Sequence, residues 1–269
     1  MSTAKPTLIF VTGAWHSPRC WTKVVSLLTA HGYKTLTPAL PSTLGSASAT
    51  FADDLDTIRS SILSETTEGS DVVVVAWSYG SLPGASAIKG LARPKADREE
   101  EGGKEGEEEG KGRRGYVIGL ALMATGFCAT GMSFLAGTGG SPPPFWSASS
   151  SGFAEFTISG PALREFFYHD LPVEEGEEWV DALTKHSLNS LSEGGELVYA
   201  GWKDVPVWFL GTKEDVGLPF EVQKGLVEAA RSEGGDVVMR EVDSGHSPML
   251  SKPEETVEFL EEAVKAFMA

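Results

Sequence analysis

The sequence has 269 residues and a formal net charge of −16 at pH 7. Nucleic acids and anionic membranes are bound by basic surfaces, so this charge argues against both as partners. The length suits one α/β domain with a small cap and a large buried core. The two cysteines, Cys20 and Cys128, make no disulfide framework, and residues 1–6 lack the apolar run of a secretory signal. We therefore expect a cytoplasmic protein.

Apolar and β-branched runs alternate with amphipathic stretches along the chain. We expect strands at 7–11, 33–37, 72–77, 116–123, 205–210 and 236–242, and helices at about 20–31, 51–63, 80–92, 220–232 and 253–267. This alternation predicts an α/β fold with a mostly parallel central sheet and helices on both faces. Catalytic loops would then lie at the carboxyl ends of the strands.

Two segments interrupt this alternation. Residues 93–114 are a low-complexity run of Glu, Lys, Arg and Gly, which cannot bury apolar area and is predicted to be a surface insert. A docking or regulatory role is the alternative. Residues 127–200 are predicted to form a small helical cap, which leaves 1–126 and 201–269 as the core. The apolar stretch 116–137 is broken by glycines and hydroxyl residues, so we expect a core strand there and no membrane span.

The run Val72–Val75 reads as a buried strand and leads into Ala76-Trp77-Ser78-Tyr79-Gly80. A tight turn from strand to helix with small residues two before and two after a serine presents the serine hydroxyl at the edge of the sheet. Ser78 is therefore a candidate nucleophile. A serine hydroxyl is a weak nucleophile until a base accepts its proton, so a histidine and an acid are also needed.

Both partners follow later in the chain. His246 stands in a loop punctuated by glycine and proline, just before the last predicted helix. Asp215 follows the strand at 205–210, and Glu214 beside it is the alternative acid. The order Ser, Asp, His along the chain is that of the α/β-hydrolases and differs from the orders in chymotrypsin and subtilisin. The chain shows no clustered metal ligands and no phosphate-binding loop, so neither a metal nor a cofactor is expected.

Several motifs together resemble the α/β-hydrolase superfamily over nearly the whole chain. They are similar to the small single-domain branch that holds plant methylesterases, hydroxynitrile lyases and their fungal and bacterial relatives. The motifs are 11–16 with Cys20-Trp21, the Ser78 turn, Glu214-Asp215 with Pro219, Gly245-His246 with 249–251, and the cap motif 167–172. Thr12 and Ala76 depart from the histidine and glycine usual in that branch.

The resemblance implies an α/β-hydrolase fold in which the backbone N–H groups of Ala14 and Tyr79 form an oxyanion hole. The residues expected to bind substrate are Gly13, Trp15, His16, Trp77, Phe127, Trp146 and Met249. Hydroxynitrile lyases of the branch carry a lysine after the catalytic histidine and a threonine at the position of Gly13. This chain has Ser247 and Gly13, as the esterases do.

The sequence therefore predicts a serine hydrolase that cleaves small hydrophobic carboxylic esters through Ser78, His246 and Asp215. One alternative is a lactonase, or a hydrolase or lyase of carbon–carbon bonds, that uses the same triad. A second is a ligand receptor with the same fold and little or no turnover. The expected partner is a small hydrophobic ester or lactone, and the expected assembly is a monomer or a homodimer.

Overall fold

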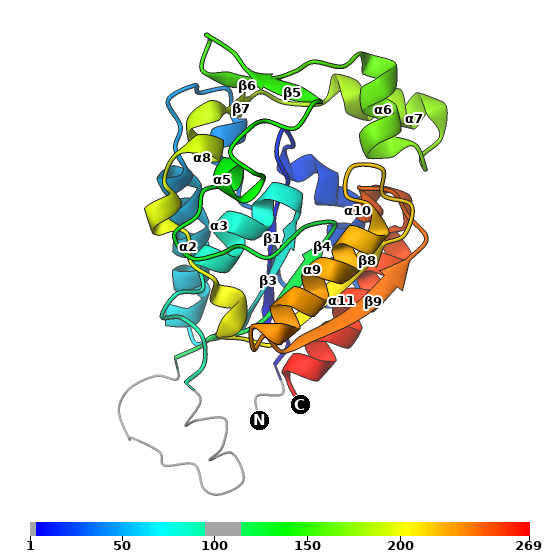
Figure 1. The fold of residues 1–269 in the computed structure, drawn as a ribbon. Coiled ribbons are helices and arrows are strands. Elements are labelled where there is room, and N and C mark those ends of the chain that lie inside the picture. Colours follow the sequence, from blue (N-terminus) through cyan, green and yellow to red (C-terminus); the bar gives the residue numbers. More distant parts are fainter. Residues whose placement is uncertain (1–3, 95–113) are drawn as a thin grey trace, which may run out of the picture.

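The computed structural model describes residues 4–94 and 114–269 (Figure 1). Most of the predicted insert at 93–114 lies outside these residues. Within them, no helix combines the length and the apolar character that a membrane span requires.

Six parallel strands form the central sheet, in the order β2-β1-β3-β4-β8-β9. The strands are β1 (Thr7–Val11), β2 (Thr35–Leu36), β3 (Val72–Trp77), β4 (Val117–Met123), β8 (Val207–Thr212) and β9 (Val237–Val242). The chain runs outward from β1 in both directions, so the strand order reverses between β1 and β3. Ligands of open α/β sheets bind at the carboxyl ends of the strands beside such a reversal.

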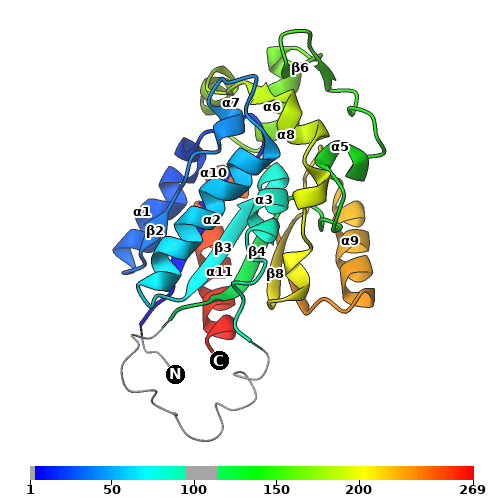
Figure 2. The same cartoon turned by 90° about the vertical axis from the view of Figure 1, so that its left-hand side faces the viewer.

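Helices cover both faces of this sheet, as the sequence predicts. The helices of the core are α1 (Thr22–Ala30), α2 (Phe51–Thr67), α3 (Ser81–Ser86), α9 (Phe220–Ser232), α10 (Pro248–Ser251) and α11 (Pro253–Phe267). Short 3₁₀ helices are η1 (Pro18–Trp21), η2 (Pro41–Thr43), η3 (Ser78–Gly80), η4 (Gly195–Leu197) and η5 (Gly201–Lys203). Helices α1 and α11 pack together on one face, while α2, α3 and α9 lie on the other (Figures 1 and 2).

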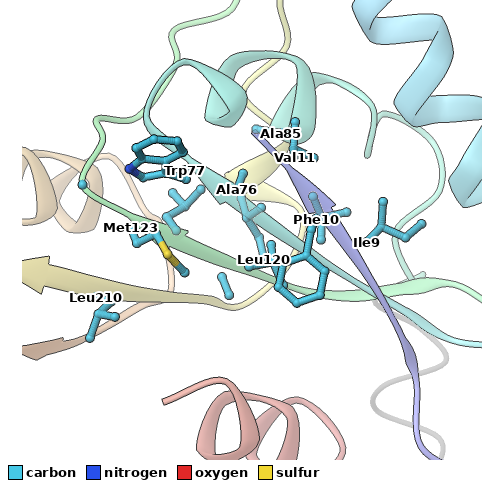
Figure 3. Close-up of a cluster of buried hydrophobic side chains, with 14 of the residues drawn as sticks. Ile9, Phe10, Val11, Ala76, Trp77, Ala85, Leu120, Met123 and Leu210 are labelled. Atoms are coloured by element: carbon cyan, nitrogen blue, oxygen red, sulfur yellow. The ribbon is translucent and has the colours of Figure 1, made fainter. Parts of the chain in front are cut away.

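The core is built by the side chains of the inner strands. Every residue of β1, β3, β4 and β8 is buried, which explains their continuous apolar runs, because a strand covered on both faces need not alternate. Figure 3 shows Phe10, Ala76 and Leu120 among the side chains of this cluster, with α3 on one side of the sheet and α11 on the other. A rigid sheet of this kind fixes the ends of the strands that carry the candidate site.

Residues 127–200, which we call the cap segment, connect β4 to β8. Their elements are α5 (Phe134–Gly137), β5 (Trp146–Ala148), β6 (Phe153–Phe156), α6 (Gly160–Tyr168), α7 (Val173–Asp181), β7 (His186–Ser187) and α8 (Leu188–Ser192). Figure 1 shows β5, β6, α6 and α7 above the carboxyl ends of the central strands. The segment was expected to be helical, but β5, β6 and β7 form an antiparallel three-stranded sheet beside the helices.

Candidate active site

Ser78 lies in the sharp turn between β3 and α3. Its backbone is in the left-handed region with φ +52°, a conformation that costs free energy in a residue other than glycine. The helix crosses so close to β1 that a Cβ on Gly80 would lie 2.4 Å from the carbonyl oxygen of Thr12. Gly84 provides the matching space over β3, since a Cβ there would lie 3.2 Å from the Cβ of Ala76. The alanine in place of the usual glycine therefore fits beside a glycine on the facing helix.

His246 lies in the loop after β9, and its imidazole contacts the serine hydroxyl. Its Nε2 lies 3.1 Å from Ser78 Oγ, and its Nδ1 lies 2.8 Å from Asp215 Oδ2. A carboxylate only accepts hydrogen bonds, so Nδ1 carries the proton and Nε2 presents its lone pair to the serine hydroxyl. The indole N–H of Trp77 donates to the carbonyl of His246 at 2.7 Å and fixes the backbone at this position.

Asp215 is buried after β8 and is held by hydrogen bonds on both oxygens. Thr212 Oγ1 donates to Oδ2 at 3.0 Å, while the amides of Gly217 and Leu218 donate to Oδ1 at 2.8 Å each. Burial acts to raise the pKa of Asp215, but His246 and the hydrogen bonds to the carboxylate outweigh it, so the pKa is lowered from its ordinary value. The side chain is therefore ionised near neutral pH. Glu214, the alternative acid, is exposed.

A buried glutamine on α9 orders the acid loop, and nothing in the local sequence pattern indicated it. Gln223 Oε1 accepts from the Thr212 amide at 3.0 Å, and its Nε2 donates to the carbonyl of Leu218 at 2.7 Å. The two contacts bracket Asp215, so one side chain fixes both ends of the turn that carries the acid.

The loop after β1 places Ala14 and Trp15 beside the serine. Trp15 has φ +60°, and the peptide between the two residues is held on both sides. His16 Nδ1 lies 2.6 Å from the Ala14 carbonyl, and the Trp15 amide donates to His186 Nδ1 at 3.3 Å. Among the residues that the structure describes, the Ala14 amide has no hydrogen-bond acceptor. That amide is thus available to a ligand, whereas the Trp15 amide is already bonded.

Both histidines that hold this peptide are buried and neutral. Burial lowers the pKa of His16 and of His186 to about 3 in each case. Because the Ala14 carbonyl can only accept, His16 carries its proton on Nδ1 and accepts from the Tyr168 hydroxyl at Nε2, 2.5 Å away. His186 has the opposite tautomer: its Nδ1 accepts from Trp15, and its Nε2 donates to Ser190 Oγ at 2.9 Å.

Tyr79, the second expected oxyanion donor, is anchored by its own side chain. Its hydroxyl donates to Asp54 Oδ2 at 2.8 Å, and Asp54 Oδ1 accepts from the Ser42 amide at 2.9 Å. Burial raises the pKa of Tyr79 well above its ordinary value, so the phenol keeps its proton. The residue lies in the first turn after the serine, where helical N–H groups lack a partner within the helix.

An apolar cavity of about 450 Å³ opens beside Ser78 and His246. Its wall comes from the strand ends, α9 and the cap segment. Among the described residues that line it, the ionisable side chains are His246, Tyr79 and Cys128. Burial raises the pKa of the Cys128 thiol to about 12. The aromatic residues of the wall are Trp15, Trp77, Tyr79, Phe127, Phe134, Phe145, Phe166 and Phe167. The described residues that line the cavity thus include no Asp, Glu, Lys or Arg.

Four residues that were expected to contact substrate do not line this cavity. Gly13 packs behind it, where a Cβ would lie 3.0 Å from the Trp77 ring. His16 is enclosed between Ala14 and Tyr168, and Met249 is fully buried. Trp146 packs edge-on against Trp15, with 6.1 Å between ring centroids. Proximity to a catalytic motif in sequence does not say which side chains face the cavity. Ala14, Trp15, Trp77, Tyr79 and Phe127 do line it, and their contact with substrate stays a prediction.

Comparisons with known proteins agree with this architecture. The alpha/beta hydrolase family matches residues 8–259, and the chain belongs to this family. Alpha/beta hydrolase nvfD of Aspergillus novofumigatus is 26% identical over 264 residues, which cover 96% of both proteins. Methylesterase MES16 from Arabidopsis has a TM-score of 0.70 at 18% identity, covering 97% of this chain and 99% of that chain. Tomato methylketone synthase I, complexed with 2-tridecanone, has a TM-score of 0.73 at 15% identity, with coverage of 98% and 99%.

Proposed function

We propose that the protein is a serine hydrolase that cleaves small, uncharged, hydrophobic carboxylic esters. The observation that carries this proposal is the hydrogen-bonded series from Ser78 Oγ through His246 to Asp215, 3.1 Å and 2.8 Å long, on the wall of an apolar cavity. These are the distances at which a base can take a proton from a nucleophile and an acid can orient the base. The family match supports hydrolysis as the reaction class.

In this mechanism, Ser78 Oγ attacks the ester carbonyl while His246 Nε2 accepts the hydroxyl proton. Asp215 holds the Nδ1–H tautomer and stabilises the imidazolium that forms. The oxyanion accepts hydrogen bonds from the amides of Ala14 and Tyr79, which are preorganised by the contacts described above. His246 then protonates the departing alcohol, leaving an acyl group on Ser78. Water, deprotonated by the same histidine, releases the acid and restores the serine.

The cavity supports the choice of substrate class. Its wall is aromatic and aliphatic, with hydroxyl groups from Ser81, Thr125, Ser133 and Thr138 as its other polar side chains. Burying a charged substrate group there would cost several kcal/mol without a countercharge. An uncharged hydrophobic acyl group is therefore favoured over an anionic one of equal size.

A pair of esters and two variants test both parts of the proposal. We expect turnover of p-nitrophenyl butyrate by the wild type, with a much lower kcat/KM for the anionic p-nitrophenyl hemisuccinate. Leu226 on α9 lines the cavity, and Leu226→Lys should shift the ratio of the two kcat/KM values toward the anionic ester. Val222→Lys adds the same charge to an exposed position of the same helix and should leave the ratio unchanged.

Each of the two comparisons has a result that would contradict the proposal. If the wild type turns over neither ester, ester hydrolysis is refuted, and the alternatives are lactone or carbon–carbon bond chemistry with the same triad, or a ligand receptor with this fold. If Leu226→Lys and Val222→Lys shift the ratio equally, the charge acts at long range and the cavity is not where the acyl group binds.

A further inference from the structure

The carboxyl end of α6, in the cap segment, contacts three different loops of the core. Tyr168 Oη donates to His16 Nε2 at 2.5 Å. His169 Nε2 lies 2.9 Å from the carbonyl oxygen of Glu214. Asp170 Oδ2 accepts from the Gly245 amide at 2.7 Å and from Ser244 Oγ at 3.1 Å. We call residues 168–170 the tie segment.

Each of these loops carries one part of the proposed catalytic machinery. His16 holds the carbonyl of Ala14, whose amide is a proposed oxyanion donor. Glu214 immediately precedes Asp215, and Gly245 immediately precedes His246. A displacement of α6 would therefore move the oxyanion loop, the acid and the base together.

The fit between the tie segment and the histidine loop is close. A Cβ on Gly245 would lie 2.8 Å from His169 Nε2 and 3.0 Å from Asp170 Oδ1, so a side chain at this position would force the two elements apart. The other carboxylate oxygen, Oδ1 of Asp170, is buried and has no hydrogen-bond partner among the described residues. Asp170 thus binds the loop that carries His246 through one of its two oxygens, Oδ2.

We propose that the tie segment is a positioning element that holds the proposed oxyanion loop, acid and base in their reactive geometry. The inference rests on the proposed function of Ser78, His246 and Asp215. The same helix supplies Phe166 and Phe167 to the cavity wall. The cap segment would therefore have two roles, lining the cavity and holding the three loops in place. Burial raises the pKa of Tyr168 well above its ordinary value, which keeps its hydroxyl a donor to His16.

The position of these residues predicts how their loss divides between kcat and KM. None of the three side chains of the tie segment lines the cavity, so they make no contact with bound substrate there. A misplacement of reacting groups by about 1 Å can lower a rate on the order of 100-fold. Loss of the Asp170 contacts should therefore lower kcat while KM stays within about twofold, since an interaction realised only in the transition state is affected.

The test is the second-order rate at which a fluorophosphonate labels Ser78, which needs no knowledge of the substrate. We expect Asp170→Ala to lower this rate by about 10- to 100-fold. Asp170→Asn keeps an oxygen that accepts from the Gly245 amide and should stay within about threefold of wild type. Glu165→Ala removes an exposed carboxylate from the same helix and is the matched control. Where p-nitrophenyl butyrate is turned over, kcat and KM of the same variants provide the second readout.

The outcomes separate this inference from the proposed function. Absence of labelling in the wild type would refute the proposed nucleophile. Labelling of Asp170→Ala at the wild-type rate would refute the positioning role of the tie segment but not the nucleophile. The same follows if Asp170→Asn loses as much labelling rate as Asp170→Ala, since the asparagine keeps the hydrogen bond. If Asp170→Ala does not fold, His169→Ala removes the hydrogen bond to the Glu214 carbonyl, and wild-type labelling of that variant overturns the inference.

Discussion

Acidification is expected to destabilise the protein through the two buried histidines beside the Ala14 loop. Burial lowers the pKa of His16 and His186 to about 3 in the folded state, whereas an unfolded chain has histidine pKa values of about 6.5. Between these values the unfolded chain binds more protons than the folded one. The contribution of the two neutral histidines to the free energy of unfolding is therefore fully present above about pH 6.5 and is lost as the pH falls toward 3.

The magnitude follows from the same two values. Each histidine contributes a slope of about 1.4 kcal/mol per pH unit within this window. From pH 7 to pH 5 the loss is about 2 kcal/mol for each and about 4 kcal/mol for both. Typical domains have only about 5 to 15 kcal/mol of stability, so the effect is large.

Urea denaturation at pH 7 and pH 5 measures this loss, and His186→Asn isolates one half of it. The asparagine oxygen can still accept from the Trp15 amide, but the side chain does not titrate. The variant should lose about 2 kcal/mol less than wild type between the two pH values, while carboxylate titrations cancel in the comparison. His31→Asn makes the same substitution at an exposed position and is the control for the effect of replacing a histidine. An equal pH dependence in His186→Asn and wild type would refute the assignment of His186 as a buried neutral residue.

Three further predictions concern the nucleophile turn and the base. Ser78→Ala should lower kcat for p-nitrophenyl butyrate by about 10⁴ to 10⁶ with little change in melting temperature, and wild-type turnover would contradict the mechanism. On the acid side, log kcat/KM should rise with pH with a slope of 1. His246 must lose one proton to act as the base, while the lowered pKa of Asp215 keeps that carboxylate ionised. A slope of 2 would contradict this assignment. Gly80→Ala should lower the free energy of unfolding by roughly 2 kcal/mol or more, since its Cβ would lie 2.4 Å from the Thr12 carbonyl; wild-type stability in urea would exclude the close crossing.

The sequence predicted the core of the fold well because its signals are local. Helices α9 and α11 have the predicted bounds, and each starts beside a proline that marks the beginning of a helix. The strand β3 also has its predicted bounds, because a short run of β-branched residues favours a buried strand over a helix. The turn at Ser78 could be placed because the motif itself demands a strained backbone and a close helix.

The cap sheet could not be predicted in the same way. Its strands have two to four residues, too few for a period to be read, and they pair over long distances in sequence, as Ala154 does with His186. The aromatic residues of the segment fit a helix or a strand equally well. The segment does contain helices, among them α6 and α7, but the expectation of a helical cap missed the sheet.

The supporting contacts of the site were hidden for the same reason. His186 bonds to Trp15 across 171 positions, and Tyr168 bonds to His16 across 152. No spacing rule connects residues so far apart. The motif at 167–172 was the one available signal, because it resembles the cap of related α/β-hydrolases.

The account depends most on Ser78 being an activated nucleophile, and covalent labelling tests this directly. The protein is treated with a fluorophosphonate and digested, and the modified peptide is sequenced by mass spectrometry, with Ser78→Ala and His246→Ala in parallel. We predict modification of the wild type at Ser78 alone, none at that position in Ser78→Ala, and a strongly reduced rate in His246→Ala. An unmodified wild type, or modification that persists at the same rate without His246, would contradict the proposed triad.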